Sequence, residues 1–85
     1  MILFNFNYEH VAEAEKFIKR AIEINKVFGQ MWTLAIDYAI YAALFKQKKD
    51  MPKTKENLSK AIEIFSKCGA DGWVVKYEKE LAVLS

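Results

Sequence analysis

Lys19 to Leu44 reads KRAIEINKVFGQMWTLAIDYAIYAAL, and Ser59 to Leu84 reads SKAIEIFSKCGADGWVVKYEKELAVL. A shift of 40 residues places the first AIEI on the second and Gly29 on Gly69. A fixed period of about 20 to 50 residues is typical of stacked repeat proteins, in which each unit buries its apolar face against the next. The repeat therefore predicts a stacked array, and proteins of this class usually hold partners and perform no chemistry.

The composition is rich in apolar residues for a short chain. The 85 residues make one small domain, 53% of them are hydrophobic and 14% are aromatic. A chain of this length is marginal when folded alone, so we expect some of its apolar surface to meet a partner chain. The net charge of +2 is too small to indicate nucleic acid or an acidic membrane as the partner.

Cys68 is the single cysteine, which excludes an internal disulfide and fits a reducing compartment. We expect a cytoplasmic protein with a buried free thiol. No basic residue precedes the apolar start of the chain, so no signal peptide is expected. The longest apolar stretch, Met31 to Phe45, is interrupted by Asp37 and is shorter than the roughly 20 residues of a membrane span. This stretch predicts a buried helix.

Helical periodicity predicts four antiparallel helices, at about residues 8–28, 31–48, 52–68 and 72–84. Gly29 and Gly69 are expected to end the first and third helices, and Pro52 to begin the third. The second helix is apolar on nearly all sides, which favours a central position. The short connections force neighbouring helices to pack side by side. The expected fold is all-α, two stacked helical hairpins that form a fragment of an α-solenoid over residues 1–85.

Each helix has a predicted inward face. In the first helix the apolar positions recur at three- and four-residue steps: Val11, Ala14, Phe17, Ile18, Ala21, Ile22, Asn25 and Phe28. The inward residues of the third helix are Leu58, Ala61, Ile62 and Phe65, and those of the fourth are Trp73, Val74, Tyr77, Leu81 and Leu84. Asn7 and Asp71 are candidate caps of the first and fourth helices.

The window from Ala35 to Cys68 resembles a tetratricopeptide repeat, a pair of helices with large and small residues at set places. The residues that carry the resemblance are Tyr38, Tyr41, Ala42, Phe45, Asp50, Leu58 and Ala61. The chain departs from the family pattern at Lys49, Thr54 and Ser66, and its period is longer than the family's. The run KAIEIFSKCGADGW is similar to the last repeat of large bacterial signalling ATPases and nucleotide cyclases.

The resemblance implies a repeat fragment with both stacking faces uncovered. Solenoid ends normally carry polar caps, so we expect the chain to associate with a second copy as a homodimer. The expected contact residues are Phe17, Trp32, Trp73 and Tyr77. The N-terminal MILFNFNY is either part of that contact or a disordered leader.

The resemblance also implies a groove that binds a protein or peptide partner. The expected groove residues are Ile36, Ala39, Ala43, Lys46 and Gln47 of the second helix and Lys76, Lys79 and Val83 of the fourth. Family members that clamp a terminal carboxylate use lysine and asparagine where this chain has Ala39 and Ala43, so an apolar partner is expected instead. Asp37 either points to solvent or lines the groove and meets a cationic group of the partner.

The sequence carries no pattern of catalytic, metal-binding or cofactor-binding residues. His10 is the single histidine and lies far from Cys68 in the chain, and no glycine-rich phosphate loop is present. The segment Lys46 to Lys55 has a local net charge of +4. It is either a solvated turn or a contact for an anionic partner, although nucleic acid is disfavoured as that partner because no aromatic or arginine residues are interleaved.

These observations leave three hypotheses about function. The first is a non-catalytic interaction module that binds protein and self-associates. The second is a C-terminal regulatory segment of a larger signalling ATPase or adenylate cyclase. The third is a weak nucleic-acid or anionic-surface binder that uses Lys46 to Lys55.

Overall fold

The structure, a computed structural model, describes residues 8–84 and the side chains of residues 12–84. Four helices make up this part of the chain: α1 (Tyr8–Val27), α2 (Met31–Gln47), α3 (Met51–Lys67) and α4 (Asp71–Leu84). Residues 8–84 contain no strand, which confirms the all-α prediction. Each helix boundary lies within one residue of its predicted position.

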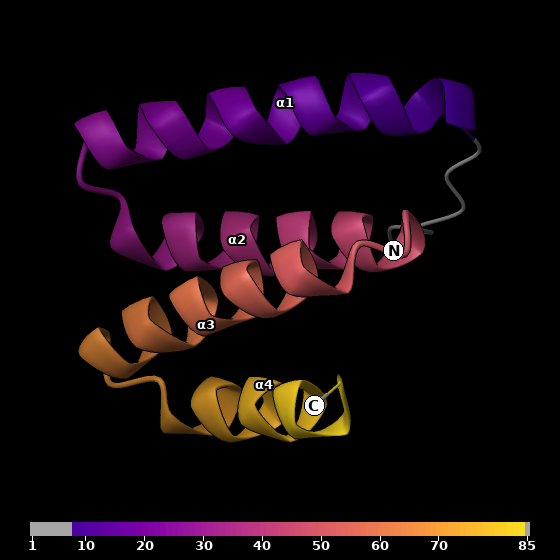
Figure 1. The fold of residues 1–85 in the computed structure, drawn as a ribbon. Coiled ribbons are helices and arrows are strands. Elements are labelled where there is room, and N and C mark those ends of the chain that lie inside the picture. The colour runs from indigo at the N-terminus through magenta and orange to yellow at the C-terminus, as the bar shows by residue number, and fades with distance from the viewer. Residues whose placement is uncertain (1–7, 85) are drawn as a thin grey trace.

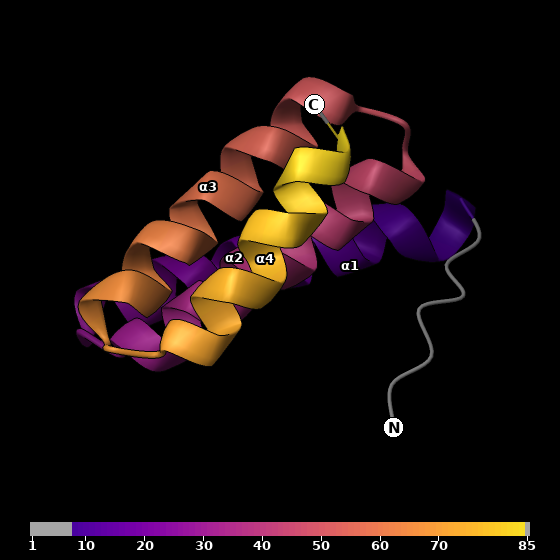
Figure 2. The ribbon, with the colours of Figure 1, turned by 90° about the horizontal axis from the view of Figure 1, so that it is seen from below.

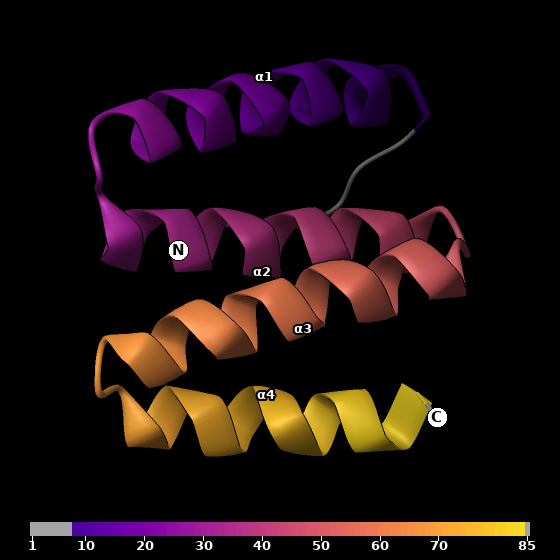
Figure 3. The same cartoon turned by 60° about the vertical axis from the view of Figure 1, so that its left-hand side comes forward.

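The helices stack in chain order, each antiparallel to the one before it (Figure 1). Every helix packs its backbone against its neighbours in sequence, and the most extensive packing joins α2 to α3. The order is the same after a rotation about the vertical axis (Figure 3), and the view from below shows α3 and α4 side by side (Figure 2). The fold is therefore two stacked hairpins, as predicted.

All three connections have the same backbone structure. Gly29, Lys49 and Gly69 have φ angles of 67°, 62° and 71°, the left-handed conformation that ends many helices. In each connection the amide of the next residue donates a 2.9 Å hydrogen bond to a carbonyl five residues earlier, in the pairs Gln30–Asn25, Asp50–Phe45 and Ala70–Phe65. The connections recur every 20 residues, so the 40-residue sequence repeat consists of two structural units.

Helix α2 lies between α1 and α3, as its apolar character on all sides predicts. Its buried residues are Leu34, Ala35, Tyr38, Ala39, Ala42, Leu44 and Phe45. Ile18 and Ile22 of α1 cover one side of this helix, and Leu58, Ala61, Ile64 and Phe65 of α3 belong to the same buried set.

The start of α3 is fixed by its cap. The Asp50 side chain accepts a 3.2 Å hydrogen bond from the backbone amide of Lys53, and Thr54 Oγ1 donates to the Asp50 carbonyl at 2.7 Å. Pro52 occupies the first turn, as expected. These contacts satisfy groups that a helix N-terminus would otherwise leave unpaired.

Two predicted features of the helices were wrong. Phe17 and Phe28 were expected to face inward, but they are 77% and 71% exposed. Among residues 8–84 the backbone of α1 packs only against α2, so these residues cover a stripe of α1 one helix wide, which Ile18 and Ile22 fill. Asp71 is the first residue of α4 rather than its cap. Asn7 and most of MILFNFNY lie outside the described residues.

Candidate functional site

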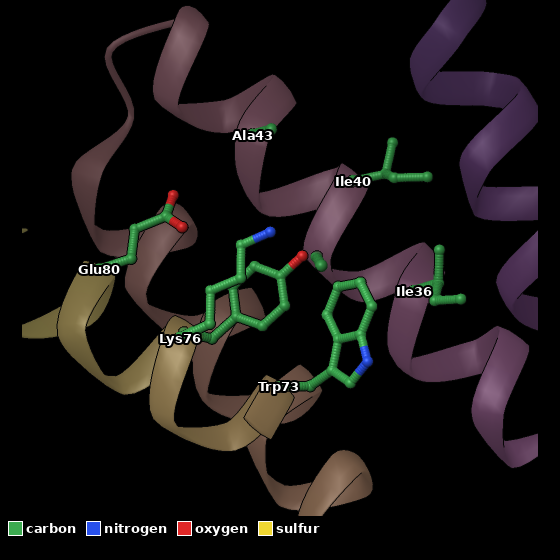
Figure 4. A pocket seen from close by; sticks show the side chains of 8 residues that line it. Ile36, Ile40, Ala43, Trp73, Lys76 and Glu80 are labelled. Atoms are coloured by element: carbon green, nitrogen blue, oxygen red, sulfur yellow. The ribbon is translucent and has the colours of Figure 1, made fainter. Parts of the chain in front are cut away.

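An open groove runs between α2 and α4 (Figure 4). It has a volume of about 420 Å³ and is lined by Ile36, Ala39, Ile40, Ala43, Trp73, Lys76, Tyr77 and Glu80. The four residues from α2 recur at three- and four-residue steps and form an apolar floor. Small alanines at two of the four positions leave room for a helix or strand to approach closely.

The α4 side of the groove rests on a cluster of four aromatic rings, which we name the aromatic cluster. The Phe65 ring, fully buried on α3, stacks against Trp73 and Tyr77 with centroids 5.6 and 5.7 Å apart. Trp32 meets Phe65 and Trp73 edge-on, at 5.2 and 5.9 Å. Because Trp32 belongs to α2, the cluster fixes α4 relative to α2 as well as α3. Offset and edge-to-face rings each add about 0.5–1.5 kcal/mol beyond area burial.

Two charged residues stand at the α4 rim of the groove. The Lys76 ammonium lies over the rings of Trp73 and Tyr77, 5.1 and 5.5 Å from their centroids. Burial, followed by the negative charge of Glu80, raises the pKa of the Tyr77 phenol, which therefore stays protonated at neutral pH. The groove thus combines an apolar floor with one cation and one anion along one edge.

Four of the nine predicted groove residues line this groove: Ile36, Ala39, Ala43 and Lys76. The other five, Asp37, Lys46, Gln47, Lys79 and Val83, do not line it. Sequence reasoning missed Ile40 and Glu80, although helical spacing from Ile36 and Lys76 pointed to both. The groove also takes in Trp73 and Tyr77, which were predicted for self-association.

Asp37 is half-buried between α1 and α2 and does not line the groove. Its Oδ2 accepts a 2.5 Å hydrogen bond from Asn25 Nδ2. Burial raises the pKa of the Asp37 carboxyl, and the hydrogen bond from Asn25 partly opposes that rise. Asp37 follows Ile36 by one residue, or about 100° around the helix, so it faces α1 rather than the groove.

The predicted self-association residues fall into two groups. Trp32, Trp73 and Tyr77 belong to the aromatic cluster and have internal partners. Phe17 stands apart on α1, beside Glu13, Lys16 and Arg20, which line a second shallow depression with it.

The basic segment from Lys46 to Lys55 is partly engaged inside the molecule. Lys48 Nζ donates to Glu15 Oε1 at 2.9 Å. Lys48 and Lys53 also lie over the Phe45 ring, 5.5 and 5.3 Å from its centroid. These contacts attach the α2–α3 connection to α1 and to the core.

Candidate reactive groups are few in the described part of the chain. Among the side chains that the structure describes, those of residues 12–84, no group of three or more His, Cys, Asp or Glu could hold a metal ion. The Cys68 thiol is free and exposed, so the expectation of a buried thiol was wrong. The side chain of His10 lies outside the described residues. None of the helices has both the length and the apolar character of a membrane span, within the same limits.

No family model matches the sequence, and no curated protein or solved structure matches it. The resemblance to tetratricopeptide repeats therefore stays a prediction.

Proposed function

We propose that this chain is a non-catalytic protein–protein interaction module whose α2–α4 groove binds an apolar helix or peptide. The observation that carries the proposal is the uncovered side of α2. This helix is apolar all round, a property of fully buried helices. Yet Ile36 and Ile40 are only half buried, and Ala43 is exposed at the groove. A bound apolar segment would cover this exposed side, so that α2 is buried on all sides, as its apolar composition predicts.

The polar groups of the groove support a protein partner over a small molecule. Lys76 and Glu80 stand one helical turn apart on the same rim, an arrangement that suits a mixed-charge flank of an amphipathic helix. The groove is open along its length and offers no enclosed cavity for a compact ligand. A regulatory segment of a larger signalling ATPase or adenylate cyclase would use the same surface, so the proposal includes that alternative.

The compartment is part of the same proposal. A free exposed thiol at Cys68 persists in a reducing environment. This supports a cytoplasmic location for the module.

Titration with a leucine- and alanine-rich amphipathic peptide tests the proposal. Trp73 lines the groove, so its fluorescence reports occupancy. The variant Ala43→Glu places a charge on an exposed groove position and is expected to weaken binding at least about tenfold. Ala82→Glu is the matched control, because Ala82 is exposed on α4 and does not line the groove. Equal affinities of the two variants, or of a scrambled peptide, would overturn the proposal.

A further inference from the structure

The two flanks of α1 differ, and one of them is identified by its contacts with Tyr38 of α2 and with Lys48 of the α2–α3 connection. Lys26 of α1 and Lys60 of α3 both lie over the Tyr38 ring, 5.9 and 5.4 Å from its centroid. Glu15 lies on the same flank as Lys26 and pairs with Lys48. This flank of α1 therefore faces the α3 side of the molecule.

The other flank of α1 is apolar and uncovered. At about 100° per residue, Phe17, Ala21 and Ile24 lie on it at steps of four and three. Phe28, which follows the last residue of α1, continues this spacing, and its amide still donates to the Ile24 carbonyl. Phe17 is 77% exposed, Ile24 49% and Phe28 71%. Aromatic side chains bury about 150–250 Å² each, so this stripe leaves a large apolar area in water.

The stripe continues the groove. Figure 4 shows Ile36 and Ile40 projecting from α2 away from Lys76 and toward the ribbon of α1. The uncovered flank of α1 lies on this same side of α2, because its other flank faces α3. The α1 stripe, the α2 floor and the α4 rim therefore form one surface, which we name the open face.

Contacts between the helices show which residues of α1 and α2 lie at the same height along the helix axes. The pairs Asn25–Asp37 and Glu15–Lys48 have residue numbers that sum to 62 and 63. Residue n of α1 therefore lies level with about residue 62 − n of α2, which places Arg20 beside residue 42.

The groove sets the level of α4 in the same way. In Figure 4, Trp73 lies at the Ile36 end of the groove and Glu80 at the Ala43 end, each 37 residues further along the chain. Arg20 and Glu80 thus share a level on opposite edges of the open face. The same two relations place Ile24 at nearly the same height along the helix axes as Tyr77, and Phe28 at nearly the same height as Trp73.

We infer that the open face is covered by a second copy of this chain, related by a two-fold axis parallel to α2. This symmetry lays α1 of each copy on α4 of the other at the same level. Arg20 then meets Glu80 of the second copy, and the pair occurs twice. Ile24 and Phe28 meet the aromatic groups of the groove. The inference rests on the proposed function and names the partner of the groove.

The charges select this symmetry over the alternative. A two-fold axis perpendicular to α2 would lay α1 on α1 and bring two copies of Arg20 within about two helical turns of one another. In the inferred dimer, like residues meet only along α2. Its floor from Ile36 to Ala43 carries no charge on the side of the groove. No like charges are forced together at the axis, where they would weaken association.

Charge reversal tests the pairing. Sedimentation over a concentration series is expected to show a dimer, and Arg20→Glu or Glu80→Arg should each raise its dissociation constant at least about tenfold. The double variant should restore the wild-type value, because the pair is re-formed with opposite polarity. Lys19→Glu is the matched control, since it changes the same charge one residue away on the flank toward α3.

Cross-linking tests the axis. In a Cys68→Ser background, Ile40→Cys should join two copies through a short bismaleimide, while Ala82→Cys, outside the groove, should not. A chain that is monomeric at every concentration would overturn the inference and leave peptide binding to the groove intact. A dimer that the double variant fails to rescue would also overturn it. Loss of peptide binding by the monomeric Arg20→Glu variant would instead count against the proposed function.

Discussion

Asn25 on α1 and Asp37 on α2 form a side-chain hydrogen bond that crosses the α1–α2 interface. Asp37 is the one charged residue between Met31 and Phe45, the most apolar stretch of the chain. Burial raises the pKa of its carboxyl despite the amide donor beside it. A half-buried carboxylate whose hydrogen-bond partner is neutral is partly desolvated at a cost in free energy, and that cost depends on pH.

The variant Asp37→Asn is expected to become more stable than the wild type as the pH rises. The folded-state pKa of Asp37 lies above 3.8. Between 3.8 and that raised value the folded protein binds more protons than the unfolded chain, so wild-type stability falls with increasing pH. The amide side chain of the variant does not titrate, so the stability of the variant does not decrease with pH for this reason. Urea unfolding from about pH 3.5 to about pH 7 measures the difference between the two proteins.

Asn25→Ala provides the complementary test. This variant removes the hydrogen bond that lowers the Asp37 pKa, so the pH range over which stability falls should extend upward. A stability difference between wild type and Asp37→Asn that is constant over the whole pH range would contradict both expectations.

The backbone of Lys49 predicts a stabilising substitution. Lys49 adopts a φ of 62°, the same left-handed conformation as Gly29 and Gly69. Side chains other than glycine are strained there, so Lys49→Gly should raise the free energy of unfolding by about 0.5–1 kcal/mol. Thermal and urea unfolding would measure the gain. A loss of stability would show that the Lys49 side chain contributes a contact that outweighs its backbone strain.

Two glycines three residues apart should respond in opposite directions. Gly69→Ala places a Cβ at a φ of 71° and should cost about 1 kcal/mol, although open space surrounds it. Gly72→Ala lies inside α4, also in open space, and should stabilise by about 0.5 kcal/mol through helix propensity. Equal effects at the two positions would contradict the role assigned to the left-handed connection.

The sequence determines the helices because each one has its own periodicity and its own terminator. It does not determine how many neighbours a helix has. Phe17 and Phe28 were assigned to the inner face of α1 because they share the spacing of Ile18, yet a helix with one neighbour buries only a narrow stripe. Cys68 was assigned to the core by residue type, but it lies in the connection at the end of α3, where the chain is exposed.

Part of the candidate site could be predicted from helical spacing. Ile36, Ala39 and Ala43 share one face of α2 by spacing alone, and the groove includes them. Asp37 was predicted as a possible groove residue because it is the one charge in this apolar stretch. It follows Ile36 directly, so its side chain points about 100° around the helix from that of Ile36. The aromatic cluster depends on how α2, α3 and α4 pack together, which no local pattern in the chain records.

The Lys48–Glu15 pair should contribute little to stability. The two atoms lie 2.9 Å apart, but the side chains are 38% and 22% exposed. Partly exposed ion pairs are worth about 0–1 kcal/mol and weaken with salt. Glu15→Gln should therefore lower the free energy of unfolding by less than about 1 kcal/mol, and the loss should shrink in about 1 M NaCl. Glu63→Gln, which removes a 3.5 Å pair with Lys67 inside α3, is the control.

Phe65 is the position at which a modest substitution should have the largest effect. Its ring is fully buried and contacts the rings of Trp32, Trp73 and Tyr77. Phe65→Leu keeps most of the apolar volume but removes every ring contact, so it should cost about 1–3 kcal/mol. The near-ultraviolet circular dichroism should fall with it, because both tryptophans lose their fixed neighbour.

Val83→Ala is the matched control for Phe65→Leu, because Val83 is 84% exposed on α4. It should change the free energy of unfolding by no more than about 0.5 kcal/mol and leave the aromatic signal intact. The Phe65 prediction fails if Phe65→Leu keeps the wild-type aromatic signal at full stability. In that case α4 would be held by Val74 and its other apolar contacts, and the groove wall would not depend on the aromatic cluster.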